Sequence, residues 1–279
     1  MTDSLDRRNL PMVLSLDRGG CDDVGLLGGK AVNLVRLCRG GFRVPRACAV
    51  TTRAFDSILA AAGALARPLA PEAFDGFPLA LEVMEGLQSF IRGGSANRFA
   101  VRSSAVAEDS AAASFAGQME SFLNVKGDTL DFYVRRCFAS CFSARVEAYR
   151  HRIGAAVDAS MAVIVQDMVE PDYAGVMFTA DPLHPGDMAI EIVEGLGEAL
   201  VSGDVTPSSY RVVRDGLKIR TDHEAVPIPA DVLRGLAATG LRVERLYDAP
   251  QDIEFAVTGQ DIHLLQSRPI TVGIHAVET

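Results

Sequence analysis

Long hydrophobic runs are absent from this sequence of 279 residues. The first ten residues carry several charges and no apolar stretch, and nowhere does the chain approach the ~20 consecutive apolar residues that a membrane-spanning helix needs. We therefore expect neither a transmembrane segment nor a secretory leader, and no membrane partner.

Cysteines are few, and none is arranged as a Cys-x-x-Cys pair. The count of five is odd, and the closest two, Cys137 and Cys141, have no histidine near them that could complete a zinc site. This pattern argues against a disulfide framework and against zinc, and it favours buried, reduced thiols. We expect a cytoplasmic protein.

An excess of basic residues is also missing, because 27 Lys and Arg residues face 36 Asp and Glu residues and the formal net charge is −9. No basic face for nucleic acid is implied, so a phosphate ligand would have to be held by a few local cations. The length and the 48% hydrophobic content suffice for a sizeable core, in one large domain or in two lobes.

The most informative stretch covers residues 99–125. An apolar lead-in ends at Arg102, small and hydroxylated residues follow, and a second apolar segment begins near Ser121. This order predicts a strand, a loop of small residues and a second strand. Such a loop can bring backbone N–H groups and hydroxyls close to a polyphosphate, with Arg102 as a planar donor, but a plain surface hairpin has the same composition.

The order of residues in this stretch resembles the nucleotide-binding domain of the family of phosphoenolpyruvate synthase, pyruvate phosphate dikinase and rifampin phosphotransferase. The shared signature is an arginine, paired serines, Glu-Asp and then Ser-Phe-Ala-Gly-Gln. A match over about two dozen positions is highly specific. The resemblance implies nucleotide contacts by Arg102, Gly117, Ser121 and Phe122.

A glycine pair precedes Lys30 and opens an amphipathic helix that continues to about Leu37. The spacing of a Walker-type phosphate loop is absent, and a glycine pair alone is also consistent with a plain helix terminus. The resemblance, which includes the Gly-Gly-Lys element, implies that Lys30 binds phosphate at the helix start.

Further along, two apolar segments, 161–169 and 174–179, are predicted to form a hairpin in a sheet covered on both faces. Gln166 interrupts the first segment. It can hydrogen-bond an adenine edge, or it can satisfy backbone groups where the strand ends. The resemblance favours contact with the nucleotide.

Residues 252–270 predict a β-hairpin with a turn from Thr258 to Asp261. Strand alternation is expected to place Asp252, Glu254 and Ala256 on one side and Leu264, Gln266 and Arg268 on another. Glu254 and Gln266 could then offer oxygens to one Mg²⁺, and Arg268 could hold a phosphate. A surface ion pair across the hairpin is the alternative.

The resemblance extends from about residue 25 to residue 270 and implies an α+β fold of the ATP-grasp class. Two lobes, 1–158 and 159–279, would close on Mg-ATP. The implied reaction is phosphoryl transfer, catalysed by Lys30, Arg102 and Arg268 together with Mg²⁺. In the family, ATP is split to AMP and phosphate, and the β-phosphoryl group is carried on a histidine of a swivelling domain to the acceptor.

The carrier histidine of the family has no counterpart among the five histidines of this chain, and the sequence ends soon after Arg268. We therefore expect an ATP-activating component that works with a separate phosphohistidine carrier and a small-molecule acceptor. Two alternatives remain open, a stand-alone ATP-dependent kinase or ligase and a non-catalytic ATP-binding module.

Overall fold

A computed structural model describes the backbone over ten ranges of the chain: 10–17, 19–61, 71–106, 109–110, 113–114, 120–143, 160–181, 184, 186–197 and 205–270. The chain divides into two compact units. Unit 1 comprises Met1–Arg39 and Arg46–Met168, and unit 2 comprises Gly40–Pro45 and Val169–Thr279. The sequence placed the boundary between 158 and 159. The division in the structure falls later because the strand that follows residue 160 pairs with strands of unit 1.

Unit 1 contains a five-stranded antiparallel sheet in the order β1-β2-β7-β3-β6. The strands of this sheet are β1 (Val13–Ser15), β2 (Ala47–Val50), β3 (Phe99–Ala105), β6 (Ser121–Val125) and β7 (Met161–Asp167). The helices and short elements of the unit are α1 (Val24–Arg39), α2 (Thr52–Ala61), η2 (Pro71–Gly76), α3 (Leu81–Arg92), η3 (Gly127–Thr129), α4 (Leu130–Ser140) and the paired strands β4 (Asp109–Ser110) and β5 (Ala113–Ser114).

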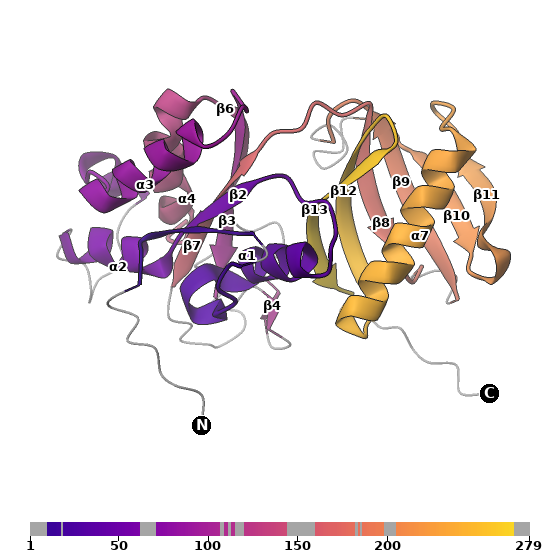
Figure 1. Ribbon diagram of the computed structural model, residues 1–279, viewed down its shortest axis with the longest axis horizontal. Coiled ribbons are helices and arrows are strands. Elements are labelled where there is room, and N and C mark those ends of the chain that lie inside the picture. The colour runs from indigo at the N-terminus through magenta and orange to yellow at the C-terminus, as the bar shows by residue number, and fades with distance from the viewer. Residues whose placement is uncertain are drawn as a thin grey trace. The chain divides into compact units, whose positions relative to one another are not determined.

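One face of this sheet forms the main core together with α2, α3 and α4 (Figure 1). Strand residues such as Val101 and Val163 are fully buried there, because alternate residues of each strand point to the same face. Phe55 of α2 and Phe138 of α4 meet with ring centroids 5.2 Å apart. Burial of such large apolar side chains contributes to the hydrophobic stabilisation of the unit.

The opposite face of the sheet carries small side chains, among them Ala49 of β2, Ala100 of β3 and Ala162 of β7, and all three are buried. Helix α1 packs on β3 and β7. Its buried apolar residues recur at helical spacing, for example Leu27, Ala31 and Leu34. Small residues on the strands allow the helix to approach closely. Polar side chains on this face are exceptions to its small, apolar character, and they are the candidates for a ligand site.

Unit 2 contains a six-stranded antiparallel sheet in the order β11-β10-β9-β8-β12-β13. Its elements are β8 (Tyr173–Phe178), β9 (Asp187–Glu194), β10 (Ser208–Val213), η4 (Asp215–Leu217), β11 (Lys218–His223), α7 (Ala230–Tyr247), β12 (Gln251–Thr258) and β13 (Asp261–Pro269). Helix α7 lies along one face of this sheet (Figure 1). At Gly240 the helix comes so close that an added Cβ would lie 2.8 Å from the side chains of Met177 and Met188.

The segment Gly40–Pro45 packs with unit 2 although α1, which precedes it, belongs to unit 1. The N–H of Leu264 donates to the carbonyl of Arg43 over 2.8 Å, and the Arg43 guanidinium pairs with Asp261. The guanidinium of Arg242 on α7 lies 4.7 Å from the ring centre of Phe42. These contacts fix the segment against β13 and α7.

The predicted hairpin of segments 161–169 and 174–179 is wrong. Both edges of β7 are hydrogen-bonded, to β2 and to β3, and both edges of β8 are hydrogen-bonded, to β9 and to β12. Because a strand has only two edges, β7 and β8 cannot pair with each other, and they belong to different units. The predicted α+β class is confirmed.

Candidate functional site

The glycine pair before Lys30 breaks α1 near its beginning. Gly28 has φ 72° and ψ 168°, a conformation outside the helical region, whereas its neighbours are helical. This region of backbone space is almost restricted to glycine. The helix therefore restarts at Gly29, and Lys30 lies in the first turn of the restarted helix, where backbone N–H groups and the helix dipole favour an anion.

Arg102 lies within β3 rather than at its end, and so do the two serines that follow it, because β3 continues to Ala105. The prediction of a loop starting directly after Arg102 is therefore wrong. Both serines are completely buried. Their hydroxyls are not available to a ligand, and Arg102, which is only partly buried, is the residue of this trio that can reach a phosphate.

Arg102 shares its face of the sheet with two other predicted site residues. Its direct partners are Ser121 on β6 and Ile164 on β7, and Gln166 lies two residues further along β7, opposite Ala100. Side chains of directly paired residues lie on the same face. Gln166 is 2% exposed. Unit 1 thus gathers Arg102, Ser121 and Gln166 on the face that α1, with Lys30, covers.

Two predicted nucleotide contacts do not join this group. Phe122 pairs with Val101 and therefore points to the opposite face of the sheet, where its ring centroid lies 5.0 Å from that of Tyr133 on α4. We accordingly assign Phe122 to the core and not to the site. Gly117 lies outside the described residues.

The second group of predicted residues lies on the hairpin of β12 and β13 in unit 2. Asp252 is directly opposite Arg268, and Glu254 is directly opposite Gln266. These four side chains lie on one face of the sheet. Met177 and Ile253, which pair with each other, belong to the other face, on which α7 packs.

The expected separation of Leu264, Gln266 and Arg268 from Asp252 and Glu254 is therefore wrong. A β-bulge shifts the register so that Phe255 pairs with Leu264 and Leu265 has no direct partner. Gln266 and Arg268 consequently share the face of the two acidic residues, whereas Leu264 points to the other face. The predicted turn between Thr258 and Asp261 is confirmed.

Arg268 is oriented by Asp252. Its Nε and Nη2 both donate to Oδ2 of Asp252, over 2.8 and 2.7 Å. The Asp252 side chain is 13% exposed and that of Arg268 38% exposed. Burial raises the pKa of Asp252 above its ordinary value of 3.8, Arg268 opposes this rise, and Glu254 adds to it. The pair holds a guanidinium at the surface of the polar face, beside the oxygens of Glu254 and Gln266.

Asp252→Asn should change the pH dependence of stability. The pKa of Asp252 is higher in the folded protein than in the unfolded chain, so the protonated carboxyl group stabilises the folded state. This stabilisation is fully present at pH values below the pKa of an unfolded aspartate, and it is lost as the pH rises through the pKa of the folded protein. The stability of the wild type relative to Asp252→Asn should thus fall as the pH rises from about 4 towards neutrality. Urea unfolding of both proteins at several pH values measures this difference, and parallel profiles would contradict it.

The hairpin residues fit a magnesium ion shared with a phosphate ligand. No cluster of three or more His, Cys, Asp or Glu side chains suited to a metal occurs in the described part of the chain. A metal held by Glu254 and Gln266 would therefore complete its coordination with phosphate or water oxygens, which is the usual environment of Mg²⁺ in nucleotide sites. A carboxylate and an amide oxygen are suitable hard ligands for this ion.

Sequence reasoning missed Glu191. This residue pairs with Val176 on β8, and Val176 pairs with Glu254, so both glutamates lie on the same face with one strand between them. The signal was present in the alternation of β9, where Met188, Ile190 and Ile192 are buried and the residues between them are polar or small. Glu191 adds negative charge to the face on which a cation would bind.

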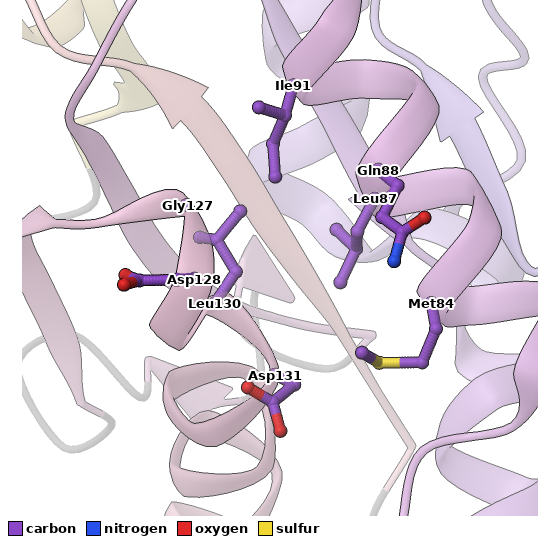
Figure 2. A pocket seen from close by; sticks show the side chains of 8 residues that line it. All are labelled: Met84, Leu87, Gln88, Ile91, Gly127, Asp128, Leu130 and Asp131. Atoms are coloured by element: carbon purple, nitrogen blue, oxygen red, sulfur yellow. The ribbon is translucent and has the colours of Figure 1, made fainter.

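A groove in unit 1 lies apart from these residues. Figure 2 shows it between α3 and the segment formed by η3 and α4, with the apolar side chains of Leu87, Ile91 and Leu130 along it. None of the predicted nucleotide contacts lines this groove. It is therefore not the candidate nucleotide site.

None of the five cysteines forms a disulfide, and Cys48, Cys137 and Cys141 are buried. Burial raises the pKa of the Cys48 and Cys137 thiols, which keeps them protonated and unreactive. Of the helices in the ranges given above, none has the length and apolar character needed to cross a bilayer.

Comparison with known protein families shows which family this chain matches. The protein family described as "Pyruvate phosphate dikinase, AMP/ATP-binding domain" matches residues 77–279. The matched region includes β3, β6 and β7 of unit 1 and the hairpin of β12 and β13. It begins after the glycine turn that precedes Lys30.

Curated relatives extend the similarity to the N-terminal part of the chain. A probable phosphoenolpyruvate synthase of Methanothermobacter thermautotrophicus is 36% identical, over 93% of this chain and 46% of the relative. A rifampicin phosphotransferase of Streptomyces sviceus is 35% identical, over 93% of this chain and 36% of the relative. The chain thus spans less than half of the length of these curated relatives.

Similarity to solved structures is weaker. A D-alanine–D-alanine ligase from Bacillus anthracis has a TM-score of 0.41 and 8% identity, covering 86% of this chain and 55% of that chain. A D-alanyl-alanine synthetase A from Vibrio cholerae has a TM-score of 0.37 and 12% identity, with 85% and 56% coverage.

Proposed function

Because the chain belongs to the family of pyruvate phosphate dikinase AMP/ATP-binding domains, we propose that it is the ATP-activating component of a dikinase-type phosphotransferase. The predicted ATP-grasp class is in line with membership in this family. ATP and Mg²⁺ are the cofactors of such a domain.

In the proposed reaction, unit 1 binds the nucleotide. Gln166 contacts the adenine, while Lys30 and Arg102 hold phosphate oxygens. Support comes from the shared face of Arg102, Ser121 and Gln166 and from the position of Lys30 at a helix start. A lysine and an arginine neutralise phosphate charge, and the arginine also fixes orientation through its planar fork of donors.

The hairpin of unit 2 would act on the phosphates that are transferred. Glu254 and Gln266 hold Mg²⁺, which supplies charge neutralisation at the phosphoryl group, and Arg268 binds a phosphate oxygen. Asp252 keeps the guanidinium of Arg268 in a fixed orientation. The observation that carries the proposal is the register of this hairpin, which places all four side chains on one face.

The finer proposal is a relay. ATP is split to AMP: the γ-phosphoryl group is transferred to water and leaves as phosphate, and the β-phosphoryl group passes to a histidine on a separate carrier protein and then to a small-molecule acceptor. None of the five histidines of this sequence has the sequence context of a carrier site, so the relay needs a histidine outside these 279 residues. His184 pairs with Asp181 at 2.9 Å, and His263 is half-buried with its pKa lowered by burial.

Chromatography of adenine nucleotides tests this function. The chain is incubated with Mg-ATP alone and with candidate phosphohistidine proteins, next to Lys30→Ala and Arg268→Ala. We expect AMP only when a carrier is present, and far less of it with either variant. ADP formed with an acceptor but no carrier would instead indicate a direct kinase, and ATP binding without turnover under every condition would indicate a non-catalytic module.

A further inference from the structure

The kink in α1 brings the helix into direct contact with the backbone of β3. A Cβ added to Gly28 would lie 2.1 Å from the carbonyl oxygen of Ser104 and 2.5 Å from its hydroxyl oxygen. No side chain fits in this space, so only glycine can occupy position 28 without displacing the strand. The closest approach of the glycine turn to the sheet is therefore at Ser104.

The hydroxyl of Ser104 bridges the two sides of this kink. It donates to the carbonyl of Leu27 over 2.8 Å and accepts from the N–H of Ala31 over 3.1 Å. Leu27 is the last residue before Gly28, and Ala31 directly follows Lys30. One fully buried hydroxyl thus satisfies a carbonyl before the kink and an N–H after it.

The same strand carries Arg102, two residues before Ser104 and on the same face of the sheet. A fixed connection between Ser104 and the glycine turn therefore fixes the backbone of Lys30 relative to Arg102. These are the two cations of unit 1 that we assign to the phosphates of ATP.

We propose that Ser104 is a positioning residue for the phosphate site: its hydroxyl holds the glycine turn so that Lys30 and Arg102 meet the same polyphosphate. This inference rests on the proposed function, because it assumes that these two cations bind ATP. Ser104 itself touches no phosphate. Its effect is transmitted through the backbone of residues 27–31.

A purely structural role for the serine is the competing explanation, and the neighbouring Ser103 provides the matched control. Ser103 is equally buried, lies on the same strand and points to the opposite face. Its hydroxyl oxygen is buried and has no hydrogen-bond partner among the described residues. Removal of this hydroxyl should leave both the fold and the phosphate site intact.

The test compares the binding of Mg-ATP and of adenosine by titration calorimetry for wild type, Ser104→Ala and Ser103→Ala. Ser104→Ala removes both hydrogen bonds of the hydroxyl, and we expect the affinity for Mg-ATP to fall about tenfold with adenosine affinity unchanged. In Ser103→Ala both affinities should stay within about twofold. If Ser104 only stabilised the fold, its removal would not lower the affinity for Mg-ATP more than the affinity for adenosine.

Ser104→Cys serves if the alanine variant does not fold, because a thiol has nearly the same shape and hydrogen-bonds more weakly. It should show a smaller loss of the same kind, limited to ATP. Equal ATP affinities in the Ser103 and Ser104 variants, or a parallel loss of adenosine affinity, would overturn the inference.

The two proposals can fail separately. A wild-type chain that binds Mg-ATP but never transfers phosphate would count against the proposed function only, since the comparison of affinities would still decide the role of Ser104. A wild-type chain that binds no Mg-ATP would overturn both.

Discussion

Arg268→Ala is expected to lower the rate of phosphoryl transfer from Mg-ATP by about 10²–10³-fold, the usual effect of removing one preorganised donor from a developing charge. The guanidinium is held by two hydrogen bonds to Asp252 and shares its face with Glu254 and Gln266. Because the orientation exists before the ligand binds, no reorganisation is needed during the reaction. The rate of AMP formation at saturating ATP, followed by chromatography with the carrier present, measures the effect.

A matched control lies in the same sheet. Arg211 on β10 pairs with Asp222 on β11 at 3.2 Å, and Arg268 pairs with Asp252 across β12 and β13 at the other edge of the sheet. Arg211→Ala removes an arginine and an ion pair but no proposed ligand, so the rate should stay within about twofold of wild type, as expected for a partly exposed pair of small energetic value. Equal losses in both variants would show that the sheet, and not the phosphate site, had been damaged.

Arg268→Lys separates charge from geometry. Lysine keeps the positive charge but cannot donate to one carboxylate oxygen through two nitrogens and still present a planar fork. We expect the logarithm of the transfer rate to fall in Arg268→Lys by at least half as much as it falls in Arg268→Ala. Full activity in Arg268→Lys would mean that charge alone matters, and the orientation by Asp252 would then have no catalytic role.

The parts of the fold that sequence predicted well are those in which one strand pair is specified by local signals. The hairpin of β12 and β13 combines alternation with a two-residue turn, and register follows from the turn. Even here the bulge near Leu265 was not predicted, because its only trace in the sequence is the apolar pair Leu264 and Leu265, which a regular strand can also contain. The consequence was an incorrect assignment of Leu264 to the face of Arg268.

The pairing of β7 could not be derived from its own residues. Met161–Asp167 is apolar at almost every position, as in any strand that is covered on both faces, and such a run carries no information on its neighbours. Its partners β2 and β3 come from distant parts of the sequence. Proximity along the chain suggested β8, which belongs to the other unit.

The residues around Arg102 were misread because small polar residues are typical of loops. In the structure, Ser103 and Ser104 continue β3, and the small size of Ser104 is what permits α1 to approach with its glycine turn. A close approach between helix and sheet also requires small residues. The sequence pattern is the same in both cases, so only the packing distinguishes them.

The glycine turn gives the second prediction of large effect. Gly28→Ala should lower the free energy of unfolding by about 3 kcal/mol or more, because alanine is strained at φ 72° and ψ 168° and its Cβ would overlap the backbone of Ser104. Backbone atoms of a central strand cannot move aside as a flexible side chain can. Urea unfolding monitored by circular dichroism measures the change.

Gly216 provides the control for the positive φ angle alone. It also has φ 72°, but no atom lies within 4 Å of a Cβ placed on it. Gly216→Ala should therefore cost only about 1–2 kcal/mol, the ordinary price of a left-handed alanine. If the two variants lost equal stability, the contact between Gly28 and Ser104 would be too loose to hold the turn. A clear excess in Gly28→Ala, with a loss of Mg-ATP affinity that Gly216→Ala lacks, would link the packing of this turn to the phosphate site.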